Sequence, residues 1–258
     1  MSKPTVAVHK FSSCDGCQLA FLNAGKDLLT LSGLVDIRHF VEAGAVDEDA
    51  IVNIAFIEGS VATPDDAERL QKIRNNSNYV VTIGACATTG GLQALRNMAD
   101  TEQWIAGIYA HPDYIQSLAT STPIRDHIKV DLELWGCPVS GRQLLEAVRA
   151  LLFGVVPVEE KDKVCVECKR QHNVCVLVTK GEPCMGPVTR TGCGAICPAF
   201  GRDCYACYGP AENINTAAMA RRLQGLGLVD EDIARRFLFI NSGAEEFNRE
   251  GKNWKNDS

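Results

Sequence analysis

Residues 51–66, IVNIAFIEGSVATPDD, hold the transition on which the fold prediction rests. The apolar run 51–57 predicts a buried strand, which Glu58-Gly59-Ser60 ends. The following Thr63-Pro64-Asp65-Asp66 predicts a helix start, because a capping hydroxyl precedes a proline of the first turn and two acids lie at the positive end of the helix dipole. A buried strand followed directly by a helix is the repeating unit of a parallel sheet.

The same alternation extends from this unit towards both ends of the chain. Short apolar runs predict further strands at residues 5–8, 35–41, 79–83 and 130–134. Periodic apolar positions predict helices at 18–31 and at 140–153, the second capped by Ser140. The expected fold class is therefore α/β, with a flavodoxin-like parallel sheet and helices on both of its faces.

A change of composition near Pro157 predicts a domain boundary. Cysteine, glycine and proline dominate residues 165–210, a stretch that cannot bury enough apolar surface unaided. Bound metal is therefore expected to supply part of its folding energy. We predict a flavodoxin-like domain at residues 1–157 and a small, irregular, cysteine-rich domain at 158–258. Its C-terminal part is expected to be helical from about 213 to 241 and to end in a polar, flexible or partner-docking tail from 245.

The bulk composition limits the possible functions. The 258 residues carry a net charge of −6, which argues against binding to nucleic acid. No stretch is apolar enough to span a membrane, and the first residues lack the features of a secretory signal, so a cytoplasmic location is expected. In that reducing compartment, the 12 cysteines are expected to bind metal and not to form disulfides.

Four cysteines follow predicted strands of the first domain: Cys14, Cys17, Cys86 and Cys137. Because ligands of parallel sheets lie outside the carboxyl ends of the strands, these thiols are expected to converge and to hold one 4Fe–4S cluster. The alternatives are unrelated core cysteines, or a thioredoxin-like redox pair at Cys14 and Cys17. The redox pair leaves the other two cysteines unexplained.

The second domain contains eight cysteines, which suit two sites of four ligands: Cys165, Cys168, Cys175, Cys184, Cys193, Cys197, Cys204 and Cys207. Paired cysteines of this kind bind zinc as well as iron–sulfur clusters. Prolines directly after Cys137 and Cys197 are similar to ferredoxin loops and favour iron–sulfur. A zinc-stabilised binding module without a redox role is the alternative.

Several motifs resemble the small subunit of nickel–iron hydrogenases. They are CDGCQLAFLN at 14–23, IEGS at 57–60, GACA at 84–87, WGCP at 135–138, GEPCMGP at 181–187 and CYACYGP at 204–210. The resemblance extends from Val6 to about Pro210. The related complex I subunit has two adjacent cysteines in its first loop, whereas this chain has C-x-x-C there, which favours the hydrogenase.

The resemblance implies three 4Fe–4S clusters and no catalytic residue on this chain. The proximal cluster would be held by Cys14, Cys17, Cys86 and Cys137. The medial cluster would be held by Cys193, Cys197, Cys204 and Cys207. The distal cluster, in the same ferredoxin-like iron–sulfur domain, would be held by Cys165, Cys168, Cys175 and Cys184. Glu58 is expected near the proximal cluster, where orienting a loop is favoured over moving protons.

The function that the resemblance implies is electron relay in a cytosolic nickel–iron hydrogenase, an oxidoreductase acting on hydrogen. The expected partners are a large subunit with the nickel–iron site and flavin/NAD(P)-binding iron–sulfur subunits, with no nucleic acid and no membrane. The all-cysteine pattern, the short length and the Cys-Gln-Leu sequence of the first loop resemble the cytosolic hydrogenases. Among these, the sulfhydrogenase delta-subunit type is the first choice, and the small subunits of deazaflavin-reducing or heterodisulfide-reductase-linked hydrogenases are the alternatives. A quinone-reductase subunit similar to that of complex I and a stand-alone flavodoxin–ferredoxin fusion are further alternatives.

Overall fold

The computed structural model describes residues 3–255. Contacts between Cα atoms divide the chain into two compact units. The first unit runs up to Leu134 and includes Pro138–Pro157, and the second consists of Trp135–Cys137 and the chain from Val158 onward. Within the described residues, no helix combines the length and the apolar character needed to cross a bilayer.

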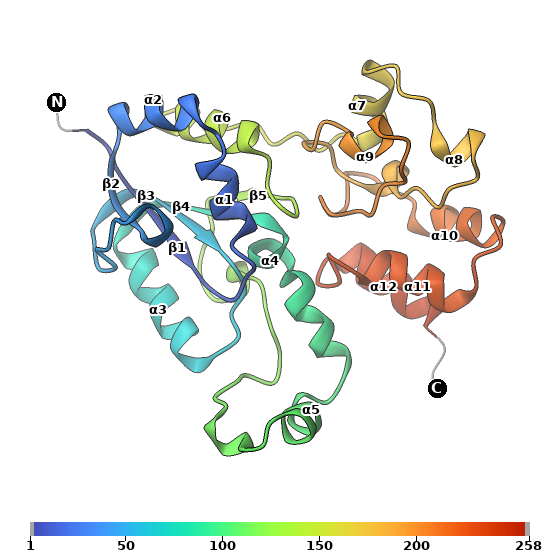
Figure 1. The fold of residues 1–258 in the computed structure, drawn as a ribbon, viewed down its shortest axis with the longest axis horizontal. Coiled ribbons are helices and arrows are strands. Elements are labelled where there is room, and N and C mark those ends of the chain that lie inside the picture. The colour runs from blue at the N-terminus through green and yellow to red at the C-terminus, as the bar shows by residue number, and fades with distance from the viewer. Residues whose placement is uncertain (1–2, 256–258) are drawn as a thin grey trace. The chain divides into compact units, whose positions relative to one another are not determined.

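The first unit is built on a five-stranded sheet in the order β2-β1-β3-β4-β5 (Figure 1). All neighbouring strands are parallel. The strands are β1 (Thr5–Lys10), β2 (Asp36–Phe40), β3 (Val52–Glu58), β4 (Ser77–Ile83) and β5 (Leu132–Leu134). This is the flavodoxin-like order, so the predicted α/β fold class is confirmed.

Helices cover both faces of this sheet, as Figure 1 shows. The α-helices are α1 (Gly16–Leu22), α2 (Lys26–Leu34), α3 (Pro64–Asn75), α4 (Gly84–Thr89), α5 (Thr101–Ile108) and α6 (Gly141–Leu152). The 3₁₀ turns are η1 (Val41–Ala43), η2 (Gly91–Met98), η3 (Pro112–Tyr114) and η4 (Ile124–Asp126). Alternate residues of each strand face opposite sides. Phe56 packs with Phe21 of α1 and Leu144 of α6, whereas Ile57 packs with Leu70 of α3.

Two local predictions in this unit need comment. Thr63 begins α3 with a capping box that includes Asp66, and Pro64 is the first helical residue, as the sequence predicts. The helix predicted at 18–31 is wrong as a single element. The chain there forms α1 and α2, separated at Gly25, whose φ of +57° lies outside the helical region.

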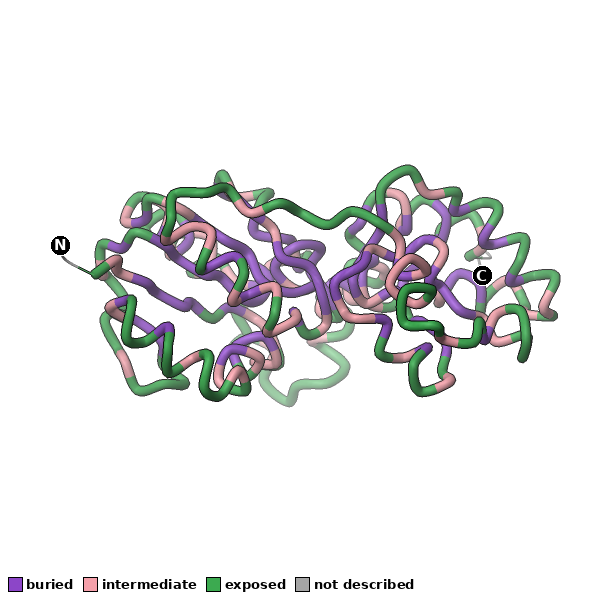
Figure 2. The backbone as a smooth tube through the Cα atoms, turned by 90° about the horizontal axis from the view of Figure 1, so that it is seen from above, coloured by how far each residue is buried: buried purple, intermediate pink, exposed green. Residues whose placement is uncertain are grey.

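The second unit consists of short helices and loops. Its helices are α7 (Val164–Arg170), α8 (Val176–Thr179), η5 (Gly186–Val188), α9 (Ile196–Ala199), α10 (Thr216–Gln224), α11 (Asp230–Leu238) and α12 (Glu245–Trp254). Buried backbone passes through both the C-terminal helices and the cysteine-rich loops (Figure 2). Met185 and Val188 of these loops pack in one core with Leu223, Ile233 and Phe237.

The predicted flexible tail is wrong over most of its length. Residues 245–254 form α12, in which Phe247 is fully buried with its ring centroid 5.8 Å from that of Phe237. Glu250 is also buried and accepts hydrogen bonds from the hydroxyl of Thr216 at 3.0 Å and from the indole N–H of Trp254 at 2.9 Å. The remainder of the predicted tail, residues 256–258, lies outside the described part of the chain.

Candidate metal centres

The loop that carries Cys14 and Cys17 follows β1 and leads into α1. Asp15, at the start of α1, has a left-handed conformation and offers no side-chain cap. Instead, the carboxylate of Glu58 accepts the N–H groups of Cys17 at 3.1 Å and of Gln18 at 3.2 Å. These are the helical N–H groups that a capping side chain normally satisfies. The end of β3 therefore fixes the direction of the cysteine loop.

Glu58 is nearly inaccessible, with only 2% of its surface exposed. Burial raises the pKa of its carboxyl, and the hydrogen bonds from Cys17 and Gln18 oppose this rise without cancelling it. Burial therefore makes the charged form of this carboxyl less favourable than it is in water. Its hydrogen bonds orient the Cys17 loop.

Glycines leave open space beside the cysteines of the first unit. Cys86 lies in the first turn of α4, directly after β4, and a Cβ atom added to Gly91 would lie 2.7 Å from its Sγ. A Cβ atom on Gly16 would lie 3.4 Å from the Sγ of Cys14. A metal cluster with inorganic sulfide needs this kind of close backbone approach to its ligands.

Cys137 follows β5 by three residues, but its contacts place it in the second unit. The preceding Trp135 lies against Gly209, where an added Cβ atom would be only 2.3 Å from the indole ring. The guanidinium of Arg190 lies 4.6 Å from the centre of the same ring. The Cys137 thiol is also among those that raise the pKa of the Cys207 thiol.

Four cysteines of the second unit are electrostatic neighbours: Cys165, Cys168, Cys175 and Cys184. Burial and, to a smaller extent, the three other thiols together raise the pKa of the Cys165 thiol to about 11. A Cβ atom on Gly186 would lie 3.5 Å from the Sγ atoms of both Cys165 and Cys184. Two thiols of this group therefore lie beside a glycine, as Cys86 lies beside Gly91 in the first unit.

The other four form a second group: Cys193, Cys197, Cys204 and Cys207. Burial, with contributions from Cys193, Cys137 and Cys197, raises the pKa of the Cys207 thiol to about 12. Burial also raises the pKa of Cys204, whose Sγ lies 3.6 Å from the hydroxyl oxygen of Thr189. The two groups meet where the Cys204 N–H donates to the Sγ of Cys184 at 3.3 Å.

The donor set fits iron–sulfur chemistry. All twelve cysteines are free of disulfides. Burial raises the pKa of five of these thiols, those of Cys165, Cys184, Cys193, Cys204 and Cys207, and a bound metal reverses this by deprotonating its ligands outright. Across residues 3–255, no three cysteine, histidine, aspartate or glutamate side chains converge as the ligands of a single metal ion do. The thiols are neighbours without meeting at one point.

The C-terminal helices hold the loop that contains Cys204 and Cys207. Arg236 of α11 pairs with Asp203 and lies with its guanidinium 5.0 Å from the centre of the Tyr205 ring. The side chain of Asn241 is buried and donates to the carbonyl of Ala206 at 2.8 Å. These contacts were not predicted from the sequence, because their partners are more than thirty residues apart and no local pattern marks them.

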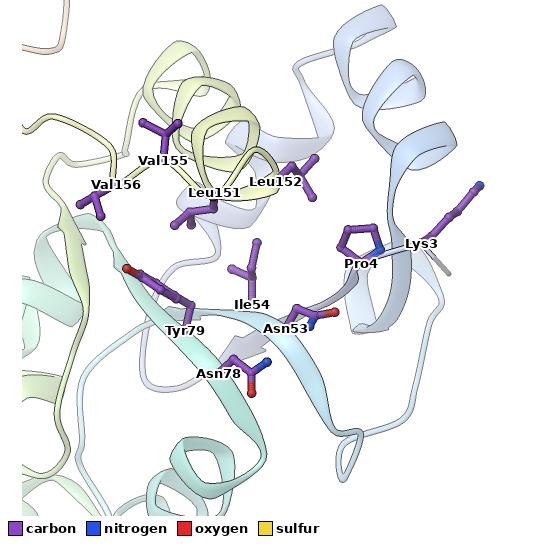
Figure 3. Close-up of a pocket in the computed structure, with 11 residues that line it drawn as sticks. Lys3, Pro4, Asn53, Ile54, Asn78, Tyr79, Leu151, Leu152, Val155 and Val156 are labelled. Atoms are coloured by element: carbon purple, nitrogen blue, oxygen red, sulfur yellow. The ribbon is translucent and has the colours of Figure 1, made fainter. Parts of the chain in front are cut away.

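A cavity of about 410 Å³ lies at the other end of the sheet, where the strands begin (Figure 3). Ile54, Tyr79 and Leu151 line it. Its described lining contains no cysteine, histidine or carboxylate side chain. The cavity is therefore separate from the candidate metal centres.

Known proteins provide an independent comparison. The sequence model of the family described as NADH ubiquinone oxidoreductase, 20 kDa subunit, matches residues 14–151. The sulfhydrogenase 2 subunit delta of Pyrococcus furiosus is 32% identical over 231 residues, which cover 90% of this chain and 96% of the relative. A subunit of the F420-non-reducing hydrogenase of Methanocaldococcus jannaschii is 28% identical over 80% of this chain and 82% of the relative.

Among solved structures, the NAD⁺-reducing [NiFe]-hydrogenase in its H₂-reduced state contains a chain with 26% identity and a TM-score of 0.55, covering 60% of this chain and 94% of that one. The chain thus belongs to the family of the NADH ubiquinone oxidoreductase 20 kDa subunit, and within it to the hydrogenase small subunits. The resemblance to the sulfhydrogenase delta type, predicted from the motifs, is confirmed by the Pyrococcus relative.

Proposed function

We propose that this chain is the electron-relay small subunit of a nickel–iron hydrogenase. The observation that carries the proposal is the arrangement of twelve cysteines that form no disulfides, many of them in neighbouring groups, on a chain of the hydrogenase small-subunit family. Bound iron–sulfur clusters supply one-electron chemistry. The chain itself makes and breaks no substrate bond.

The proposal assigns four cysteines to each of three 4Fe–4S clusters. Cys14, Cys17, Cys86 and Cys137 are the proposed ligands of the proximal cluster. The medial cluster is assigned to Cys193, Cys197, Cys204 and Cys207, and the distal cluster to Cys165, Cys168, Cys175 and Cys184. The electrostatic neighbours of Cys165, which are Cys184, Cys168 and Cys175, support the distal assignment, and Cys193 and Cys197 are among the neighbours of Cys207 together with Cys137.

The protein residues act by holding and burying the thiols. Glu58 orients the Cys17 loop through two backbone hydrogen bonds, and Thr189 lies within hydrogen-bonding reach of Cys204. Glycines 16, 91 and 186 keep side chains away from the sulfur atoms. Burial, hydrogen bonds and nearby charges are the means by which a protein sets the potential of such a centre.

The proposed partners are a large subunit that carries the nickel–iron site and a flavin- and NAD(P)-binding subunit that exchanges electrons with the distal cluster, all in the cytoplasm. Similarity to a chain of an NAD⁺-reducing hydrogenase supports this choice of acceptor. Similarity to F420-non-reducing hydrogenase subunits supports a heterodisulfide-reductase-linked subunit as the second candidate. Hydrogen-dependent reduction of NAD⁺ or NADP⁺ by the purified native complex distinguishes the two.

Metal analysis tests the central proposal. The native complex is purified anaerobically, and iron, zinc and acid-labile sulfide are measured per copy of this chain, after subtracting the metal of the partner subunits. Three clusters require about twelve iron and about twelve sulfide. Zinc without sulfide refutes electron relay and identifies the cysteine-rich unit as a zinc-stabilised binding module.

A further inference from the structure

Glu167 lies on α7 between Cys165 and Cys168, but its carboxylate contacts the loop of a different cysteine. One of its oxygens accepts the N–H of Gly192 at 3.1 Å, and the other accepts the N–H of Ala195 at 3.2 Å. The second oxygen is also 4.0 Å from the Sγ of Cys193. Both carboxylate oxygens are therefore committed to the residues on either side of Cys193.

The loop held in this way has an unusual backbone. Gly192, Gly194 and Ala195 all have positive φ angles, of +125°, +69° and +48°. Ala195 is fully buried, and alanine rarely adopts this left-handed conformation unless its surroundings impose it. Gln171, one helical turn after Glu167, donates from its side-chain amide to the carbonyl of Gly194 at 2.8 Å. One side chain of α7 and that of the residue directly after it thus hold the loop.

We propose that Glu167 is a positioning residue that joins the two cysteine groups of the second unit and lowers the reduction potential of the centre bound by Cys193. The inference rests on the proposed function, because it requires a redox centre at Cys193. A cluster gains an electron on reduction, and a negative charge beside one of its sulfur ligands opposes that gain. The geometry places this charge beside Cys193, which belongs to one cysteine group. The helix that carries Glu167 also carries Cys165 and Cys168, which belong to the other group.

The contacts with this loop also distinguish Glu167 from Gln171. Both side chains hold the same loop, but only Glu167 is charged. Loss of either one removes a contact to the loop, whereas only loss of Glu167 removes the charge next to Cys193. A purely structural role therefore predicts similar effects for the two residues, and an electrostatic role predicts different effects.

The test is a redox titration of the anaerobic native complex, followed by electron paramagnetic resonance. Four variants are compared with the wild type: Glu167→Gln, Glu167→Asp, Gln171→Ala and Glu231→Gln. Glu231 is an exposed carboxylate on α11 of the same unit, paired with Arg235, and serves as the matched control for loss of a charge. Iron and sulfide contents are measured for each preparation.

In Glu167→Gln we expect one cluster to become easier to reduce by about tenfold, which is about 59 mV for a one-electron couple. The aspartate variant retains the charge and should lie nearer to the wild type, and the Gln171→Ala and Glu231→Gln potentials should be unchanged. The glutamine variant can lose iron, and the aspartate variant then decides. The proposal is still supported if the aspartate variant keeps its iron and sulfide and a reduction potential near the wild-type value. Equal shifts in Glu167→Gln and Gln171→Ala, or an unshifted Glu167→Gln with full iron content, overturn it. A wild-type complex without iron and sulfide overturns the proposed function instead.

Discussion

Replacement of Glu58 separates the two roles of its side chain. Glu58→Ala removes both the acceptor for two N–H groups and the charge, whereas Glu58→Gln removes the charge and keeps one acceptor oxygen. Burial raises the pKa of this carboxyl, so both variants relieve part of the cost of burying its charge. The two variants should therefore differ in stability mainly through the N–H groups left without an acceptor, one in the glutamine variant and two in the alanine variant.

The expected size of the effect follows from the contacts. Glu58→Ala leaves the N–H groups of Cys17 and Gln18 without their acceptor, at about 1–3 kcal/mol for each buried group. Removal of the buried charge offsets part of this loss, so the net destabilisation is about 3 kcal/mol. In a unit of this size, that lowers Tm by about 6–12 °C. Glu58→Gln removes the same charge but leaves only one N–H group without an acceptor, so it should cost about 1 kcal/mol, less than the alanine variant.

Circular dichroism melts of the anaerobic full-length chain measure the stability, and hydrogen exchange of residues 14–22 measures the loop directly. Glu68→Ala, an exposed carboxylate on α3, is the matched control and should change stability by less than about 0.5 kcal/mol. Faster exchange in the alanine variant alone is expected. The reasoning is refuted if glutamine is as damaging as alanine, or if alanine at 58 behaves like alanine at 68.

Three further predictions concern other parts of the chain. Burial lowers the pKa of His9, which is stacked on His39, from 6.5 to about 3, so the unfolded chain binds a proton at a higher pH than the folded chain does. The free energy of unfolding, measured by urea titration, should therefore fall by about 2 kcal/mol between pH 7 and pH 5. This part of the pH dependence should vanish in His9→Leu. Gly209→Ala forces a Cβ atom into the ring of Trp135, at a residue whose φ of +70° already disfavours alanine. This variant should have a lower Tm and a quenched or shifted tryptophan fluorescence, whereas Gly33→Ala, at an exposed site, is the control. Phe247→Ala should destabilise the chain by about 3–5 kcal/mol in the same melts, and a change below about 1 kcal/mol would show that α12 does not belong to the core.

The sequence was sufficient to predict the sheet because its strands are short, continuous runs of buried residues. Ala55, Phe56 and Ile57 are fully buried, and the glycine and capping signals after them end the strand where the structure does. The predicted flavodoxin-like parallel sheet is confirmed, and the structure supplies its strand order, in which β1 pairs with both β2 and β3. Local signals therefore suffice where one face or both faces of an element are covered by apolar neighbours.

Errors arose where tertiary contacts outweigh the local pattern. Residues 245–254 are mostly polar, and only the burial of Phe247, Glu250 and Trp254 against the neighbouring helices makes them a stable helix. The spacing of cysteines indicated metal binding but could not show which thiols are neighbours. Likewise, no local pattern connects Glu58 to Cys17 or Glu167 to Cys193, because 41 and 26 residues separate them.

Glu58 and Glu167 nevertheless follow one physical rule. Each carboxylate accepts two backbone N–H groups next to a cysteine, and each belongs to a different element from the loop that it holds. Backbone N–H groups in such loops have no partner in regular secondary structure, so a buried loop needs acceptors from elsewhere. An amide could supply one of these bonds, but a carboxylate supplies both and adds a negative charge beside the thiol. Under the proposed function, each of these two side chains would therefore contribute both to the geometry of a cysteine loop and to the charge around a cluster.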